Sequence, residues 1–76
     1  MNTQTTGGIK IVYDKDGETI TFLDNDACHT ISTEHVVVKF NKEQLESFDI
    51  GESITIENKK FTKTAENVLN VQTVSL

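Results

Sequence analysis

The stretch Phe48–Phe61, FDIGESITIENKKF, shows how this chain is built. Ile54 and Ile56 alternate with polar residues, which is the period of a half-buried β-strand. A turn signal follows at residues 58–60, and Phe61 begins another stretch of the same kind. Two strands joined by so short a turn predict an antiparallel hairpin whose core residues are Ile54, Ile56 and Phe61.

The same alternation recurs on both sides of this hairpin. GIKIVY (8–13) and ETITFL (18–23) flank the loop DKDG, where Gly17 is expected to take a positive φ. Further strands are predicted in ACHTIS (27–32), EHVVVKF (34–40) and VLNVQTVSL (68–76). The β-branched residues Thr, Val and Ile, numbering 11, 7 and 7, suit such strands.

One segment, NKEQLESF (41–48), has a helical pattern instead. Asn41 is a good N-cap, and Gln44 three residues later completes a capping box. Leu45 and Phe48 lie three residues apart and therefore share one face. The segment is too short to be stable alone, so we expect it to pack that face on the sheet.

These elements predict a mainly β protein. With 76 residues there is room for a single domain. We expect a small β-barrel or rolled antiparallel sheet of about six short strands, with one short helix near 41–48. The domain is expected to span residues 8–76, and the polar residues 1–7 are expected to be frayed or disordered.

Charge and composition restrict the function. Twelve acids, seven lysines and no arginine give a net charge of −5, which disfavours nucleic-acid binding. The sequence contains no membrane-length apolar run and no signal-peptide pattern, so we expect no membrane partner and a cytoplasmic location. Abundant Lys, Asn and Ile without Arg or Pro are typical of an A+T-rich genome, which suggests a bacterial cell or a phage-infected host.

Cys28, His29 and His35 are the candidates for a nucleophile or a metal site. Neighbours on a strand point to opposite faces, so Cys28 and His29 cannot act together. We therefore predict a buried cysteine and two exposed histidines. The Asp-rich loops lack the spacing of a calcium-binding EF-hand, and no catalytic motif is present. The sequence predicts neither an enzyme, nor a cofactor, nor a metal site.

Two surfaces are candidates for binding a protein. Six acids and a single lysine lie between residues 14 and 34, which favours a basic partner. The C-terminal segment has no charged residue after Glu66, so it is predicted to be an exposed edge strand that adds a strand from another molecule. The predicted acidic surface contains Asp14, Asp16, Glu18, Asp24 and Asp26, and the predicted edge contains Val71, Thr73 and Val74 with Leu76 beyond them.

The sequence therefore predicts a non-enzymatic protein-interaction domain. It would either self-associate or bind a larger protein, for example as an acidic accessory or inhibitor protein of a phage or mobile element. The alternative is a small barrel that binds nucleic acid by stacking bases on exposed aromatic rings. The rings available for stacking are those of Tyr13, Phe22, Phe40 and Phe61.

Overall fold

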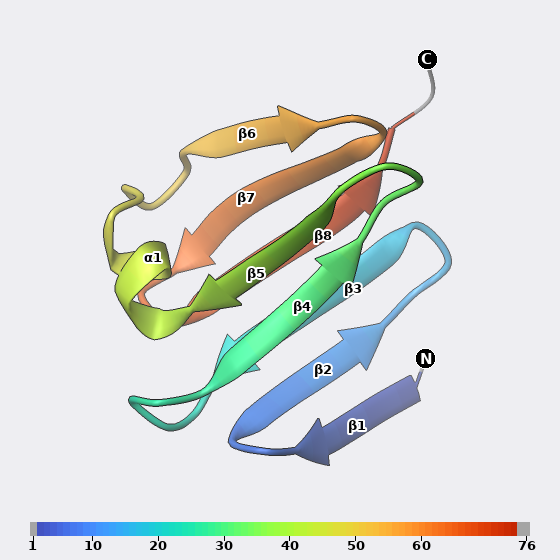
Figure 1. The fold of residues 1–76 in the computed structure, drawn as a ribbon. Helices are drawn as coiled ribbons and strands as arrows, with labels where there is room; N and C mark the ends of the chain where they lie inside the picture. Colours follow the sequence, from blue (N-terminus) through green and yellow to red (C-terminus); the bar gives the residue numbers. More distant parts are fainter. Residues whose placement is uncertain (1, 75–76) are drawn as a thin grey trace.

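In a computed structural model, which describes residues 2–74 without the side chains of residues 2 and 6, the chain is mainly β with one short helix. Figure 1 shows the arrangement of these elements. In chain order they are β1 (Asn2–Thr6), β2 (Ile9–Tyr13), β3 (Gly17–Phe22), β4 (Cys28–Ser32), β5 (Val37–Asn41), α1 (Lys42–Glu46), β6 (Ser53–Ile56), β7 (Lys59–Ala65) and β8 (Val68–Thr73).

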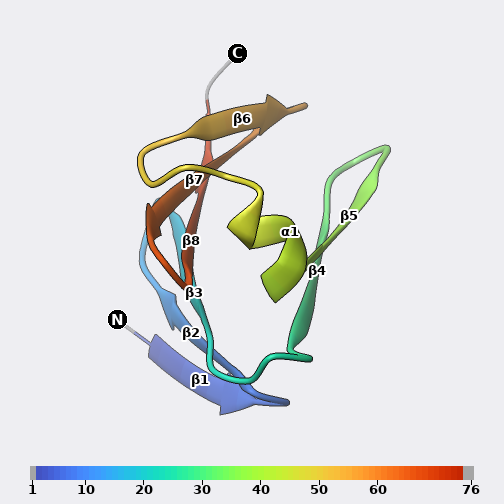
Figure 2. The same cartoon turned by 90° about the vertical axis from the view of Figure 1, so that its left-hand side faces the viewer.

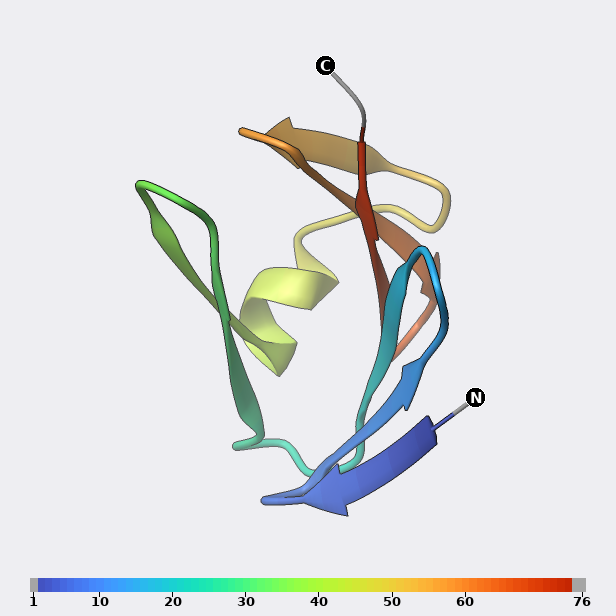
Figure 3. The same ribbon diagram turned by 90° about the vertical axis from the view of Figure 1, so that its right-hand side faces the viewer.

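Six strands form an antiparallel sheet in the order β1-β2-β3-β8-β7-β6, while β4 and β5 form a separate hairpin. Figures 2 and 3 show that the sheet is curved and that α1 lies between it and this hairpin. Within residues 2–74, β1 and β6 each have one neighbour, so the sheet is not closed into a barrel. The antiparallel β prediction is confirmed, and the barrel is not.

Cross-strand partners place the apolar residues on the concave side of the sheet. Ile11, Ile20 and Leu69 lie in one row across three strands, and all three are buried. Phe61 is fully buried, while Ile54 and Ile56 are only partly buried where they pack on the core. The buried apolar cluster comprises Ile9, Ile11, Ile20, Phe22, Ala27, Ile31, Phe40, Leu45, Phe61, Leu69 and Val71.

The predicted helix is present, but at Lys42–Glu46 it is shorter than the segment 41–48 in which it is expected. The Asn41 side chain accepts a hydrogen bond from the Gln44 backbone N–H at 2.8 Å, and the Gln44 side chain accepts one from the Asn41 N–H at 3.2 Å. This is the reciprocal capping box. Leu45 is fully buried, and Phe48 packs edge-on against Phe40 with the ring centroids 6.2 Å apart.

The N-terminal prediction is wrong for residues 2–6, which form β1 paired along its length with β2. Gly7 and Gly8 both have positive φ, at 57° and 76°, and join the two strands by a two-residue turn. Such turns suit the twist of a hairpin and need residues that tolerate positive φ. The polar composition of the segment concealed a strand, because an edge strand need bury few side chains.

Gly17 has a different role from the one predicted. Its φ is not positive; instead β8 passes so close that a Cβ at this position would overlap the Val71 carbonyl oxygen. The turn before it is closed by Asp14, whose carboxylate accepts hydrogen bonds from the N–H groups of Asp16 and Gly17. The predicted hairpin is therefore confirmed, with the glycine required for close strand packing.

The edge-strand prediction for the C-terminal segment is wrong. β8 lies between β3 and β7, so its backbone pairs on both sides. Val71 is buried, Thr73 bonds through its hydroxyl to Lys59, and Val74 continues from the strand with its N–H bonded to the Asn58 carbonyl. The segment lacks charge because it is the central strand, and Leu76 is outside the described residues.

Candidate functional site

Three turns that are distant in the sequence lie at the same end of the molecule (Figure 1). The Thr73 N–H donates to the Asp16 carbonyl, and the Val74 N–H donates to the Asn58 carbonyl. The His35 N–H donates to the Glu57 carboxylate at 3.3 Å. We call this region the three-turn end and define it as residues 14–18, 33–37 and 57–59.

The three-turn end is acidic and carries exposed apolar groups. It has five carboxylates and two lysines, a net −3 of the total −5 if His35 is neutral. Val36 and Val37 are exposed here at 41% and 67%. The charged side chains are Asp14, Asp16, Glu18, Glu34 and Glu57 with Lys15 and Lys59.

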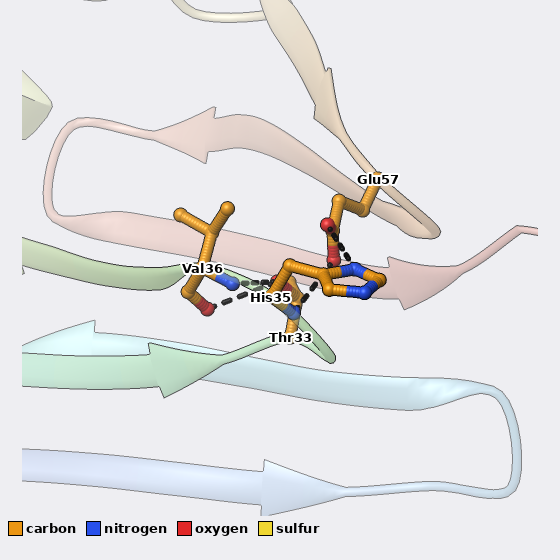
Figure 4. A network of polar contacts seen from close by, with 4 residues as sticks. All are labelled: Thr33, His35, Val36 and Glu57. Carbon is orange, nitrogen blue, oxygen red and sulfur yellow. Dashed lines mark hydrogen bonds and ion pairs between the residues drawn. The ribbon is translucent and has the colours of Figure 1, made fainter.

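Figure 4 shows the contact that joins the β4–β5 turn to the β6–β7 turn. His35 Nδ1 lies 3.0 Å from Glu57 Oε1, and Glu57 has a φ of 55°, which is uncommon for a residue with a side chain. Thr33 closes its own turn, because its hydroxyl donates to the Val36 carbonyl and accepts from the Val36 N–H. Glu57 thus anchors a turn that is ordered by its own bonds.

The pKa of Glu57 is lowered from its ordinary value, most strongly by the nearby Thr33 hydroxyl; partial burial opposes this shift, and the His35 N–H, ring and charge lower the pKa further. The Thr33 hydroxyl has one proton, which it donates to the Val36 carbonyl; the two oxygen atoms are 2.9 Å apart. The His35 backbone N–H is therefore the donor whose geometry is fixed, and we regard it as the main contact that favours the carboxylate.

Acidification is expected to release the β4–β5 turn from Glu57. Because the folded pKa is lowered, the carboxylate stabilises this contact fully above its ordinary pKa of 4.5, and the stabilisation is lost as the pH falls through the folded value. Amide hydrogen exchange at His35, followed by NMR at decreasing pH, would measure the release. In a Glu57→Gln variant this acid-dependent step should be absent, and its persistence there would contradict the assignment.

Two shallow depressions lie at or next to the three-turn end. One, of about 370 Å³, is lined by Glu34, His35, Glu57 and Asn58. The other, of about 240 Å³, is lined by residues of four strands, β2, β3, β7 and β8. Both are shallow and open to solvent, which suits contact with a protein surface better than enclosure of a small molecule. The second is lined by Tyr13, Gly17, Glu18, Lys59 and Val71.

Glu18 and His29 form a contact between the two layers that the sequence analysis missed. Glu18 is on the concave side of the sheet, and its Oε1 lies 3.9 Å from His29 Nε2. Each side chain is 21% exposed, so the prediction of an exposed His29 is wrong. The available signal was the position of His29 two residues before buried Ile31, which puts both on the inward face of β4.

Cys28, His29 and His35 are not brought together. Cys28 is exposed on the outward face of β4, so its predicted burial is wrong, whereas His35 is exposed as predicted. His35 lies in the turn at the far end of the hairpin from Cys28. Within the described part of the chain, no three His, Cys, Asp or Glu side chains gather as they would around a metal ion.

The predicted acidic surface is split between the two ends of β3. Asp14, Asp16 and Glu18 lie at the three-turn end, where β3 begins. Asp24 and Asp26 lie after its last residue, in the loop that leads to β4. Glu34 and Glu57 take their place at the three-turn end. Only the tertiary arrangement of the strands puts these two carboxylates at the same end of the molecule as Asp14 and Asp16.

The aromatic rings are directed into the core. Phe22, Phe40 and Phe61 are buried, and Tyr13 is half-buried against the core. The Tyr13 hydroxyl also donates to the Gln4 side chain at 3.3 Å. None of these four rings is exposed as the stacking platform that a single-strand-binding barrel requires.

The convex face of the sheet has the opposite charge pattern. On each strand, the residues of this face alternate with the residues that point to the concave side. Within residues 2–74 this face has two lysines and no acid, so the carboxylates are confined to the ends, the helix and the hairpin side. The face consists of Thr3, Thr5, Lys10, Val12, Thr19, Thr21, Ser53, Thr55, Lys60, Thr62, Val68, Asn70 and Gln72.

Comparison of the chain with protein-family models, with curated proteins and with solved structures gives no match. Among residues 2–74, no helix has both the length and the apolar character needed to span a bilayer.

Proposed function

We propose that this chain is a non-enzymatic protein-interaction domain that binds a basic protein surface through its three-turn end. The observation that supports the proposal is that three turns place five carboxylates, together with exposed Val36 and Val37, at this one end of the molecule. An apolar centre with a charged rim is the usual anatomy of a protein interface. The acidic rim would steer a basic partner toward this end and fix its orientation.

The arrangement favours this function over nucleic-acid binding. An acidic end repels phosphate, and the convex face, which lacks acids, has two lysines and no aromatic residue. An acidic accessory or inhibitor protein, acting in the cytoplasm of a bacterial cell or of a phage-infected host, is the setting that we propose. In that setting the three-turn end would occupy a basic site on a larger protein.

Neutralising two carboxylates at the three-turn end is expected to weaken partner capture. Asp16 and Glu34 are exposed, and their side chains make no hydrogen bond within the described residues, so Asp16→Asn with Glu34→Gln should leave the fold intact. Loss of two attractive pairs should lower affinity roughly tenfold. Capture from bacterial lysate on the immobilised full chain, quantified by mass spectrometry at low and high salt, measures the effect.

The matched control is Asp26→Asn with Glu66→Gln, which makes the same change in charge at the opposite end of the sheet. This variant should capture the partner as well as the unmodified chain does. Equal capture by the Asp16/Glu34 variant, or binding that does not weaken with salt, would show that the acidic three-turn end is not the binding surface.

A further inference from the structure

The free edge of β1 has features that suit strand addition. β1 ends the six-stranded sheet and, within residues 2–74, pairs only with β2. Its sequence, Asn-Thr-Gln-Thr-Thr, has no charged residue and no proline. Charges, prolines and bulges are the usual protection of an exposed edge, and β1 has none of them.

The turn between β1 and β2 determines which backbone groups face outward. In a two-residue hairpin the residues that flank the turn, here Thr6 and Ile9, form a hydrogen-bonded pair. Hydrogen-bonded and non-hydrogen-bonded pairs then alternate along the ladder. Gln4 therefore bonds to β2, while the N–H and C=O groups of Thr3 and Thr5 point to the free edge.

Charge distinguishes β1 from the other strands that have a free edge in residues 2–74, namely β4, β5 and β6. Symmetric antiparallel pairing of β5 with a second copy would place Lys39 opposite itself. Similar pairing of β4 would oppose Asp26 and Glu34, and pairing of β6 would oppose Glu52 and Glu57. Like charges directly opposite one another destabilise a strand pair.

We propose that two copies of this chain associate through β1, antiparallel about a two-fold axis at Gln4. Thr3 of one copy then lies opposite Thr5 of the other, and each such pair can exchange two backbone hydrogen bonds. Thr–Thr pairs across strands are favourable. The two six-stranded sheets become one continuous sheet of twelve strands.

The dimer should be weak and strengthened by salt. One short strand from each copy makes an interface at the small end of specific contacts. Each copy carries a net charge of −5, so association works against a general repulsion that salt screens. Binding of a basic partner at the three-turn end has the opposite salt dependence, so the two surfaces can be tested separately.

Sedimentation equilibrium of the full chain over increasing concentration and salt tests the proposal. We expect a reversible monomer–dimer equilibrium. Thr3→Lys with Thr5→Lys places lysines opposite lysines and should raise the dissociation constant at least tenfold, although the lower net charge of −3 (−5 + 2) alone would favour association. The control is Ser53→Lys with Thr55→Lys, the same spacing on edge strand β6, which should dimerise like the unmodified chain.

A charge-exchange mixture separates loss of pairing from loss of folding. Thr3→Glu with Thr5→Glu should also remain monomeric, but an equimolar mixture with the lysine variant pairs lysine with glutamate at both positions. The mixture should recover a dimer at least as tight as the original. A chain that stays monomeric at all concentrations, a lysine variant that dimerises unchanged, or a mixture that fails to associate would each overturn the proposal.

Discussion

Replacing Gly17 with alanine is expected to destabilise the domain by at least about 3 kcal/mol, at the upper end of the cost of overpacking. The added Cβ would overlap the Val71 carbonyl oxygen and approach Gln72 Cα to 3.0 Å. Both atoms belong to the backbone of the central strand β8, so no side chain can rotate away. Relief requires β3 and β8 to separate where they join the two halves of the sheet. Urea denaturation measures the loss.

The matched substitution is Gly7→Ala. Its Cβ meets no atom within 4 Å, and its cost comes from a φ of 57°, about 1–2 kcal/mol for a residue with a side chain. Gly17→Ala should therefore be the more damaging of the two. If the two variants have equal denaturation midpoints, the close approach of β3 and β8 at Gly17 is not real.

Truncating Phe61 to alanine is expected to cost about 3–5 kcal/mol, because the change removes transfer free energy and leaves a cavity in the core. Phe61 is fully buried, and its ring centroid lies 5.2 Å from that of Phe40. This contact joins the sheet to the β4–β5 hairpin. A domain of this size has a total stability of only about 3–5 kcal/mol, so the variant should be largely unfolded. Near-UV circular dichroism and urea denaturation would show it.

Ile54→Ala serves as the comparison on the neighbouring strand. Ile54 lies directly opposite Phe61 but is only partly buried, so the substitution should cost clearly less. If the Ile54→Ala variant were as unstable as Phe61→Ala, the edge strand β6 would have to be buried more deeply than the partial exposure of Ile54 indicates.

Local signals in the sequence were sufficient for the helix and two of the hairpins. The capping box of Asn41 and Gln44 involves atoms three residues apart, and the turn before Gly17 is closed by the adjacent Asp14. Alternation also identified Phe61 as a core residue. Each of these features is determined by neighbours along the chain, and a single sequence contains that information.

The position of each strand in the sheet could not be read from the sequence. An uncharged segment is compatible with both an edge and a central strand, and it describes both β1 and β8. The pairing of β3 with β8 places Val71 in the centre of the sheet, and no local pattern specifies that pairing. The contact of Glu57 with His35 likewise depends on how the β4–β5 hairpin packs over the sheet.

The pairing of β3 with β8 also determines when folding can finish. Thr19 and Asn70 are bonded across 51 residues of chain, so the two halves of the sheet meet only after a long loop closes. During synthesis, the β1–β2–β3 meander leaves the ribosome first and must wait with the β3 edge uncovered. It can merge with the β6–β7 hairpin only when β8 emerges between them. Until that moment, nascent chains on neighbouring ribosomes expose matching β3 edges. Misassembly through β3 is therefore expected during synthesis and not in the folded protein, where β8 covers that edge.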